Sequence, residues 1–342
     1  MRRPIAVSMF ALVVLTSWST ALPAAPREEN RAPAPGQLSP LPSYVRRVEP
    51  AVVGISVRVP QNRPSAATLG EERWGSGVIF DAKEGYALSV SYALLDAEQI
   101  EIALRDGRKV PAKLVGLDLE VGLGVVKLLG KGPWPAAAFG DSTRTAAGDV
   151  AGTVGVVEDG GLVAVAGHVD AVRPFAAAWE YMLDRAFIVS PHNRAFGGAA
   201  LVDAGGRVVG ITSLRLGEPP YVDLAIPVQK FLAGKDELLS RGRVVSRRAR
   251  PWLGLYTVPR EGDLVVAGVS PVGPARSAGF REGDVIVRLN GAKVASQEDF
   301  YTRLWQGAVG DEVQLIVQRA ARFEAISVRP ADRYRVYRTS DR

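Results

Sequence analysis

The stretch RAFGGAALVDAGGRVVGI, residues 194–211, carries the local signals of two antiparallel strands joined by a tight turn. A pair of glycines leads into an apolar run at 200–202. Asp-Ala-Gly-Gly at 203–206 supplies residues that favour a tight turn, and a second apolar run follows at 207–211. The pattern therefore predicts a glycine turn, a strand, a tight turn and a returning strand.

Similar short apolar runs recur along most of the chain. Several are rich in β-branched residues, and turn residues separate them, as at Asp106-Gly107. Many short strands with regular turns predict a β-barrel or a β-sandwich. The expected strands of this first unit are 52–59, 77–80, 86–90, 100–104, 123–129, 149–157, 162–172, 185–189 and the pair within 194–211.

Composition fits two globular domains plus tails. The chain has 342 residues, of which 47% are hydrophobic and 23% charged, so it can bury a core. Its 36 glycines and 23 prolines favour β-structure with many turns over helical bundles. The absence of cysteine excludes disulfides, zinc-thiolate sites and thiol catalysis.

The N-terminus has the order of a secretory signal peptide. Arg2 and Arg3 precede an apolar run, and small residues follow at 19–21. We expect residues 1–25 to be a signal peptide and 26–42, rich in Pro, Ala and charge, to be a disordered leader. The alternative is an uncleaved anchor, but the apolar run is short for a membrane span. The sequence thus predicts export to the periplasm or the cell exterior.

A second unit follows a basic connector. Residues 241–250 form an arginine-rich linker, and 251–330 alternate strand and helix patterns. The segments RPWLGLYT (250–257) and SPVGPARSAGFREGDVIVRLNG (270–291) resemble a bacterial PDZ domain over nearly the whole unit. The last residues, 331–342, are basic and polar and are expected to be a mobile tail.

The predicted peptide site of this unit lies in its Leu-Gly-Leu loop. The backbone N–H groups of Leu253, Gly254 and Leu255 can form a nest for a carboxylate, and the strand edge beside them can accept a peptide. Phe300 and Leu304, one helical turn apart, are expected to line the side-chain pocket. The alternative is that Leu253 and Leu255 are only core residues and that the groove is shut.

Residues 44–250 resemble the trypsin-like, secreted HtrA/Deg-type serine proteases. The segments VEPAVVGISV (48–57), GGAALVDAGGRVVGI (197–211) and VDLAIPVQKF (222–231) carry the resemblance, together with the whole stretch 75–128. The resemblance implies a trypsin-like double β-barrel at 43–240, followed by the PDZ domain. The fold class is therefore mostly β, with an α+β PDZ domain.

The resemblance also implies a degenerate catalytic triad. Tyr92 stands at the position of the family's histidine, and Gly122 at that of its aspartate. The serine position is Gly197 when counted back from Leu201, or Phe196 when the glycine pair is aligned with one inserted residue. A phenol with an ordinary pKa near 10 is a poor base, and glycine supplies neither charge nor nucleophile. We therefore expect a pseudoprotease, since loss of the serine or histidine costs about 10⁶-fold in turnover.

A substitute site is one alternative. The chain has two histidines, His168 and His192, and Ser190 lies two residues before the second. Residues two apart on a strand share a face, so Ser190 and His192 could be neighbours. No paired His/Asp/Glu spacing indicates a metal, and no cofactor is expected.

The function expected from the sequence is that of a scaffold or regulator in protein quality control. The partners are C-terminal or unfolded segments of other proteins, bound by the PDZ domain. The alternatives are an active endopeptidase using displaced residues, or a structural subunit that assembles with active homologues. The family resemblance allows a homotrimer. The basic linker is expected to be solvated or to touch anionic surfaces weakly, and no nucleic-acid partner is expected.

Overall fold

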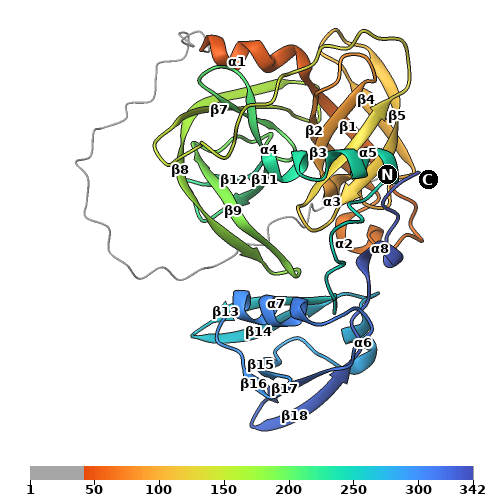
Figure 1. Ribbon diagram of the computed structural model, residues 1–342, viewed down its shortest axis with the longest axis vertical. Helices are drawn as coiled ribbons and strands as arrows, with labels where there is room; N and C mark the ends of the chain where they lie inside the picture. The colour runs from red at the N-terminus through yellow and green to blue at the C-terminus, as the bar shows by residue number, and fades with distance from the viewer. Residues whose placement is uncertain (1–41, 342) are drawn as a thin grey trace, which may run out of the picture.

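The computed structural model describes residues 42–341, so the predicted signal peptide and nearly all of the predicted leader lie outside the described residues. The first domain contains two closed six-stranded barrels (Figure 1). The order in the first barrel is β1-β2-β3-β6-β5-β4. Its strands are β1 (Val52–Arg58), β2 (Glu72–Ile79), β3 (Tyr86–Val90), β4 (Gln99–Ala103), β5 (Lys109–Asp118) and β6 (Leu123–Leu128).

The second barrel has the same strand order, β10-β11-β12-β9-β8-β7 when read around its circumference. Its strands are β7 (Val150–Val156), β8 (Leu162–Ala177), β9 (Tyr181–Ser190), β10 (Ala200–Asp203), β11 (Val208–Leu216) and β12 (Val222–Pro227). The strand pair expected within 194–211 is present as β10 and β11, and Gly206 takes a positive φ of 76° in the turn between them. Only glycine adopts that backbone conformation at low cost.

Short helices complete the barrel domain. They are α1 (Ser43–Val48), the 3₁₀ turn η1 (Glu49–Ala51), α2 (Ala66–Leu69), α3 (Ser91–Leu94), α4 (Val228–Leu232) and α5 (Lys235–Arg241). Gly234 stands at the N-cap of α5 and separates it from α4. None of the helices within residues 42–341 has both the length and the apolar character that a membrane span requires.

The PDZ domain is a sheet with order β13-β14-β15-β17-β18, and β16 pairs with β15 at its side. Its strands are β13 (Leu255–Arg260), β14 (Asp263–Val269), β15 (Val285–Leu289), β16 (Ala292–Lys293), β17 (Val313–Arg319) and β18 (Arg322–Val328). The helices α6 (Pro274–Ala278) and α7 (Gln297–Gln306) accompany the sheet. Ser296 caps α7 by accepting a hydrogen bond from the Asp299 N–H. The predicted fold class, a trypsin-like double barrel followed by a PDZ domain, is confirmed.

The C-terminal segment corrects one expectation. Residues 331–341 were expected to be a mobile tail, but they contain α8 (Arg333–Val336) and return to the first barrel (Figure 1). The Tyr334 hydroxyl accepts a hydrogen bond from the Leu119 N–H at 2.9 Å, and the Asp341 carboxylate accepts one from the Leu114 N–H at 2.8 Å. A basic composition is compatible with order here because backbone groups of the barrel supply the partners.

The linker corrects a second expectation. Arg247 donates to both carboxylate oxygens of the buried Asp118 at 2.8 Å, and Arg250 contacts the buried Glu120 at 2.9 Å. Arg250 also lies over the Trp305 ring of the PDZ domain, 4.1 Å from the ring centroid. These arginines of 241–250 are therefore ion-paired groups that join the two domains, and not simply a solvated spacer.

Candidate functional site

The structure brings the three predicted triad positions together at the junction of the two barrels. Tyr92 lies in α3, directly after β3, and Gly122 precedes β6. The Ser91 N–H donates to the Gly122 carbonyl at 2.9 Å, which holds these two segments side by side. Gly197 lies in the turn before β10.

Tyr92 lies at one side of the region between the three predicted triad positions. Its hydroxyl donates to the carbonyl of Ser213 in β11 at 2.8 Å. Burial raises the pKa of the Tyr92 phenol above its ordinary value. The phenol is consequently a hydrogen-bond donor that stays protonated at neutral pH.

Gly197 faces the same hydroxyl. A Cβ atom at Gly197 would lie 3.1 Å from the Tyr92 oxygen and within 4 Å of nothing else outside its chain neighbours. Phe196 lies elsewhere, with its ring centroid 5.6 Å from that of His192. A side chain at position 197 would therefore point at Tyr92, which favours the ungapped register for the serine position.

A different tyrosine fills the space that a side chain at Gly122 would need. A Cβ atom there would lie 2.7 Å from the hydroxyl of Tyr181, the first residue of β9. The Tyr181 hydroxyl donates to the neighbouring Val121 carbonyl at 2.6 Å. Gly122 also has a positive φ of 86°, so both space and backbone conformation oppose a side chain at this position.

A backbone donor beside Gly197 is already used. The Ala195 N–H donates to the side-chain oxygen of Asn193 at 2.8 Å. Asn193 is fully buried, and its amide nitrogen donates to Thr153 and Val163. The Asn193 side chain thus fixes the loop before Gly197 in a conformation that directs the Ala195 N–H inward.

The two histidines do not form a rebuilt site with Ser190. The Ser190 hydroxyl donates to Asp170 at 2.8 Å, and His168 contacts the same carboxylate oxygen at 2.9 Å. The His192 ring nitrogen Nδ1 lies 2.6 Å from the buried Asp223. Each histidine therefore has a carboxylate partner, while the serine hydroxyl bonds to an aspartate, which cannot activate it as a histidine would.

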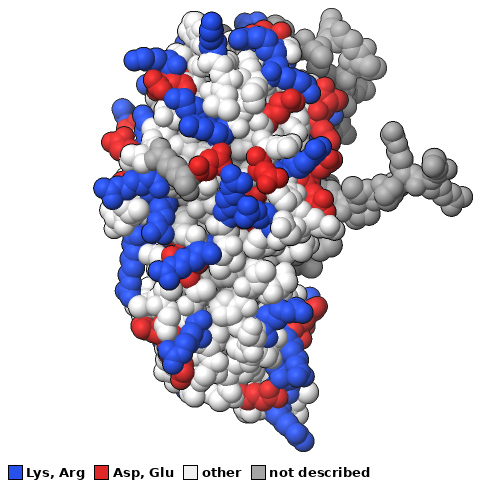
Figure 2. Space-filling view, turned by 90° about the vertical axis from the view of Figure 1, so that its right-hand side faces the viewer, with Lys and Arg blue, Asp and Glu red and all other residues white. Residues whose placement is uncertain are grey.

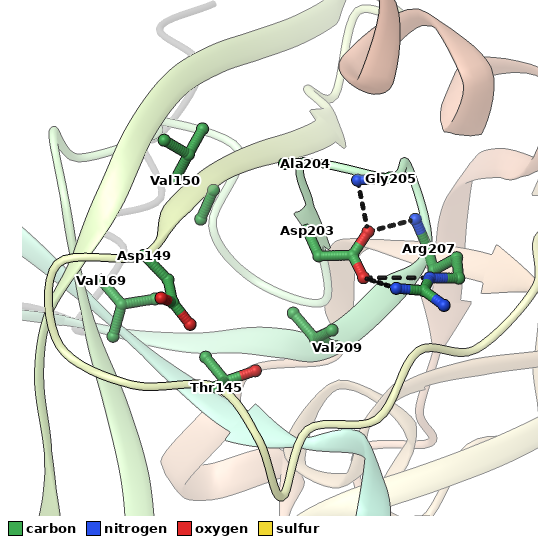
Figure 3. Close-up of a pocket in the computed structure, with 10 residues that line it drawn as sticks. Thr145, Asp149, Val150, Val169, Asp203, Ala204, Gly205, Arg207 and Val209 are labelled. Atoms are coloured by element: carbon green, nitrogen blue, oxygen red, sulfur yellow. Dashed lines mark hydrogen bonds and ion pairs between the residues drawn. The ribbon is translucent and has the colours of Figure 1, made fainter.

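A shallow pocket of about 390 Å³ lies on the second barrel, away from these positions (Figure 3). Asp203 and Arg207 lie at one side of it and form an ion pair at 2.9 Å, while Asp149 and Thr145 lie across from them. The Asp203 carboxylate also accepts the N–H groups of Gly205 and Arg207. The charges that line the pocket are thus largely paired within the β10–β11 turn.

The predicted carboxylate nest of the PDZ domain exists and holds a carboxylate from the same chain. The N–H groups of Gly254 and Leu255 both donate to Oε1 of Glu180 at 2.8 Å, and the Leu253 N–H donates to Oε2 at 2.9 Å. Glu180 is 1% exposed and lies in the turn between β8 and β9. Burial raises the pKa of its carboxyl to about 7, against the opposing effect of the three N–H donors.

The other predicted pocket residues are in the PDZ core. Phe300 and Leu304 of α7 are fully buried in one cluster with Leu253 and Leu255. A Cβ atom at Gly254 would meet the Cα of Gly273 at 2.7 Å. A side chain at Gly254 would therefore disturb the PDZ backbone itself.

Sequence reasoning missed Glu180, Tyr181 and Tyr301. All three have side chains that bond to backbone groups more than fifty residues away. The available signal was the segment AAAWEYM at 176–182, in which one acidic residue stands among apolar ones between two strand patterns. That signal predicts a hairpin tip but not the group that the tip contacts.

Charge on the surface is mixed. Figure 2 shows Lys and Arg side chains interspersed with Asp and Glu over both domains on the face that it presents. The linker arginines Arg247 and Arg250 are engaged with buried carboxylates, as described above. Residues 42–341 include no group of three or more His, Asp or Glu that could hold a metal ion.

Comparison with known families identifies both domains. Residues 75–211 match the trypsin-like peptidase domain, and residues 251–329 match the PDZ domain. The chain is 28% identical to the serine protease Do-like HtrB of Bacillus subtilis, over 84% of this chain and 70% of that protein. It is 27% identical to the periplasmic pH-dependent serine endoprotease DegQ of Escherichia coli, over 83% of this chain and 70% of that protein.

Solved structures agree with these matches. The HtrA-type protease AlgW with a tripeptide is 26% identical, with a TM-score of 0.53 over 85% of this chain and 97% of that one. A serine endoprotease from Yersinia pestis is 28% identical, with a TM-score of 0.50 over 84% of this chain and 96% of that one. With its two barrels followed by a PDZ domain, the chain belongs to the HtrA-type family of trypsin-like serine proteases.

Proposed function

We propose that this protein is an exported HtrA-type pseudoprotease that acts as a scaffold or regulator in protein quality control. Its PDZ domain captures C-terminal or extended segments of other proteins. Its barrels supply a rigid body without peptidase activity. The name of the DegQ relative places that protein in the periplasm, and the basic, apolar and small residues at 1–25 support export of this chain as well.

The observation that carries the proposal is the Tyr92 hydroxyl between Gly197 and the Ser213 carbonyl. A serine protease needs a base within hydrogen-bond reach of its nucleophile, and a carboxylate that orients that base. At these three positions the chain has a protonated phenol, a glycine where a side chain would meet the Tyr181 hydroxyl, and a second glycine. None of the three roles has a group that can perform it.

The backbone supports the same conclusion. In trypsin-like enzymes the oxyanion hole is formed by the N–H of the nucleophilic residue and the N–H two residues before it. With Gly197 as the nucleophile position, the second donor is Ala195, whose N–H donates to Asn193. A tetrahedral intermediate would have to displace that bond, so residual catalysis from the hole is also disfavoured.

Peptide capture is supported by the loop at 253–255, whose three N–H groups converge on one carboxylate. Backbone nests of this kind recognise C-terminal carboxylates, and an exposed strand edge adds the peptide to the sheet. The related structure of AlgW is a structure with a tripeptide. By analogy, we propose peptides with a free apolar C-terminus as the ligand class.

Assembly follows from the family by analogy alone. A homotrimer, or a mixed assembly with active homologues, is the proposed quaternary state. Equilibrium sedimentation of the mature chain, alone and with an active homologue from the same host, distinguishes these from a monomer.

The absence of peptidase activity is tested with the mature chain, lacking residues 1–25, and unfolded casein. We expect no cleavage above that of a buffer control over a day. Cleavage that survives purification and is abolished by His192→Ala or Ser190→Ala would identify a displaced catalytic site and overturn the proposal.

Peptide capture is tested by fluorescence polarisation with one labelled heptapeptide ending in Ala-Val-Val, as free acid and as amide. Charge-assisted hydrogen bonds contribute about 1.5–3 kcal/mol each, so the amide should bind at least about tenfold more weakly. Equal binding of both forms would show that the loop is not a carboxylate site.

A further inference from the structure

The β8–β9 hairpin reaches from the second barrel to the PDZ domain (Figure 1). Its tip, residues 177–181, has Ala177 paired with Tyr181 and a three-residue turn between them. Glu180, the last residue of the turn, takes a positive φ of 54°. Three-residue hairpin loops place a residue in this conformation, where glycine is usual, so a glutamate at this point is an uncommon choice.

The Glu180 side chain enters the nest as a C-terminal carboxylate would. Both of its oxygens accept backbone N–H groups of Leu253, Gly254 and Leu255 at 2.8–3.2 Å. The carboxylate is completely covered by protein at this point. Three converging N–H donors of the PDZ domain that could hold a peptide carboxylate are therefore already used.

The backbone of the tip follows the free edge of β13. The Thr257 N–H donates to the Ala178 carbonyl at 2.8 Å, two residues beyond the contact between the Leu255 N–H and Glu180. Residue 178 lies opposite residue 257 through a backbone bond, and the side chain of residue 180 reaches residue 255, so the tip runs in the opposite direction to β13. The direction is that of a peptide added as a strand, and the Thr257–Ala178 bond is a backbone bond of the kind such a strand makes.

A buried tyrosine of α7 holds the other side of the tip. The Tyr301 hydroxyl lies 2.7 Å from the Ala177 carbonyl, to which it donates, and it accepts the Glu180 N–H at 3.1 Å. Ala176 and Met182, which flank the tip, pack against the apolar core of the PDZ domain. The tip is therefore bound through its carboxylate, its backbone and its side chains, as a peptide ligand is.

We propose that the hairpin tip 177–181 is an internal ligand of the PDZ groove, and that a partner's free C-terminus binds only by displacing Glu180 from the nest. This inference rests on the proposed peptide capture and adds the competition that regulates it. An intramolecular ligand competes at an effective concentration on the order of millimolar. Weak peptides are excluded, and the groove opens for partners that supply both a terminal carboxylate and further strand contacts.

The displaced hairpin connects the groove to the barrel junction. Tyr181 follows Glu180 directly, and its hydroxyl bonds to Val121 beside Gly122. Its ring stacks on Trp179 with centroids 6.1 Å apart. The residue that fills the nest is therefore directly followed by the tyrosine that fills the space at Gly122.

The first experiment compares peptide affinity in the full mature chain and two variants. Glu180→Ala removes the carboxylate, and Glu180→Gln keeps its shape without its charge. Glu282→Gln, which changes an exposed carboxylate of the PDZ domain, is the matched control. With the labelled Ala-Val-Val heptapeptide, we expect both Glu180 variants to bind at least tenfold more tightly than the wild type and the control to match the wild type. Equal affinity in all four proteins would overturn the internal-ligand proposal while leaving peptide capture intact.

The second experiment measures docking without a peptide. The chain has no cysteine, so single cysteines at the exposed positions Lys131 and Arg322 can carry a pair of spin labels. We expect one narrow interlabel distance in the wild type and a broad distribution in Glu180→Ala. A narrow distribution in both would overturn the proposal. If the distribution is broad in Glu180→Ala but this variant binds no peptide, the internal ligand is supported and the proposed peptide capture is wrong. Failure of the internal-ligand proposal can therefore be told apart from failure of the proposed peptide capture.

Discussion

The junction of the two barrels holds the predicted triad positions and the loop at 253–255 of the PDZ domain is the predicted carboxylate nest, and the two differ in the groups that form them. At the junction, the three positions predicted for the triad are a tyrosine and two glycines, and the hydroxyls of Tyr92 and Tyr181 lie against the two glycines. At the nest, all three N–H donors at 253–255 are in place and hold a carboxylate. A site made of side chains is lost through single substitutions. A site made of backbone persists for as long as the loop keeps its conformation.

The same hairpin contacts both sites. Tyr181 fills the space beside Gly122, and the adjacent Glu180 fills the nest. Glu180 is the last residue of the turn and Tyr181 is the first residue of β9, and their side chains contact different domains. Two neighbouring residues thus contact a predicted triad position and the predicted nest, and the predictions below test how independent these two contacts are.

The largest effect is expected for Gly122→Asp, which restores the family's carboxylate. The new Cβ atom meets the Tyr181 hydroxyl at 2.7 Å, and the residue is held at a positive φ. Strain and overpacking together should cost about 3–5 kcal/mol in the free energy of unfolding. Urea denaturation measures this.

Gly197→Ser is the matched comparison at the same junction. Position 197 lacks a positive φ, and its Cβ atom meets only the Tyr92 hydroxyl at 3.1 Å. We expect the free energy of unfolding to change by no more than about 1 kcal/mol. Equal destabilisation of the two variants would show that position 197 does not accept a side chain more readily than position 122 does.

A smaller effect is expected for Arg247→Met in the linker. The change leaves the buried Asp118 without its cationic partner, although two backbone N–H groups still bond to that carboxylate. Since the Arg247 side chain is one-third exposed, the free energy of unfolding should fall by about 1–3 kcal/mol. Arg248→Met, at an exposed neighbouring position, is the control and should leave the urea midpoint unchanged.

Tyr301→Phe tests the docked hairpin from the PDZ side. It removes a hydroxyl that bonds to the Ala177 carbonyl and to the Glu180 N–H. The hairpin tip should then bind the PDZ groove less favourably, by about 1–2 kcal/mol. Peptide affinity should rise about five- to thirtyfold, as measured by polarisation. A fall in affinity together with an intact circular dichroism spectrum would mean that Tyr301 serves the incoming peptide and not the hairpin.

The smallest effect is a pH dependence from Glu180. Its pKa is raised from 4.5 to about 7 in the folded protein, mainly by burial, so the folded state binds a proton more tightly than the unfolded state. Stability should therefore increase as the pH falls from 8 to 6, by on the order of 1 kcal/mol. The charged or titratable groups near it are Tyr256, Tyr301 and Arg333, and the two tyrosines stay neutral in this range.

Glu180→Gln removes this titration and is the test of its origin. The difference in urea midpoint between pH 8 and pH 6 should shrink in the variant. An unchanged difference would assign the pH dependence to other groups, among which Asp223 also has a pKa raised by burial.

Local pattern predicted much of the architecture. Gly-Gly, Asp-Ala-Gly-Gly and alternating apolar residues determine strands and turns within a few residues, and β10 and β11 lie where the stretch 194–211 placed them. The loop at 253–255 was predicted as a nest because its residue types allow a close approach of backbone to a ligand. Its ligand was not predicted, because every backbone N–H has the same chemistry whatever the sequence around it.

By itself, the sequence determined the order of two barrels and a PDZ domain, and the residue types at the positions predicted for the triad. Only the tertiary structure decided what fills the spaces left by those residues. Glu180 reaches donors 73 to 75 residues away, and Asp341 reaches Leu114 across 227 residues. Such contacts depend on how closed barrels and a docked domain place distant segments in space, and no local propensity encodes that placement.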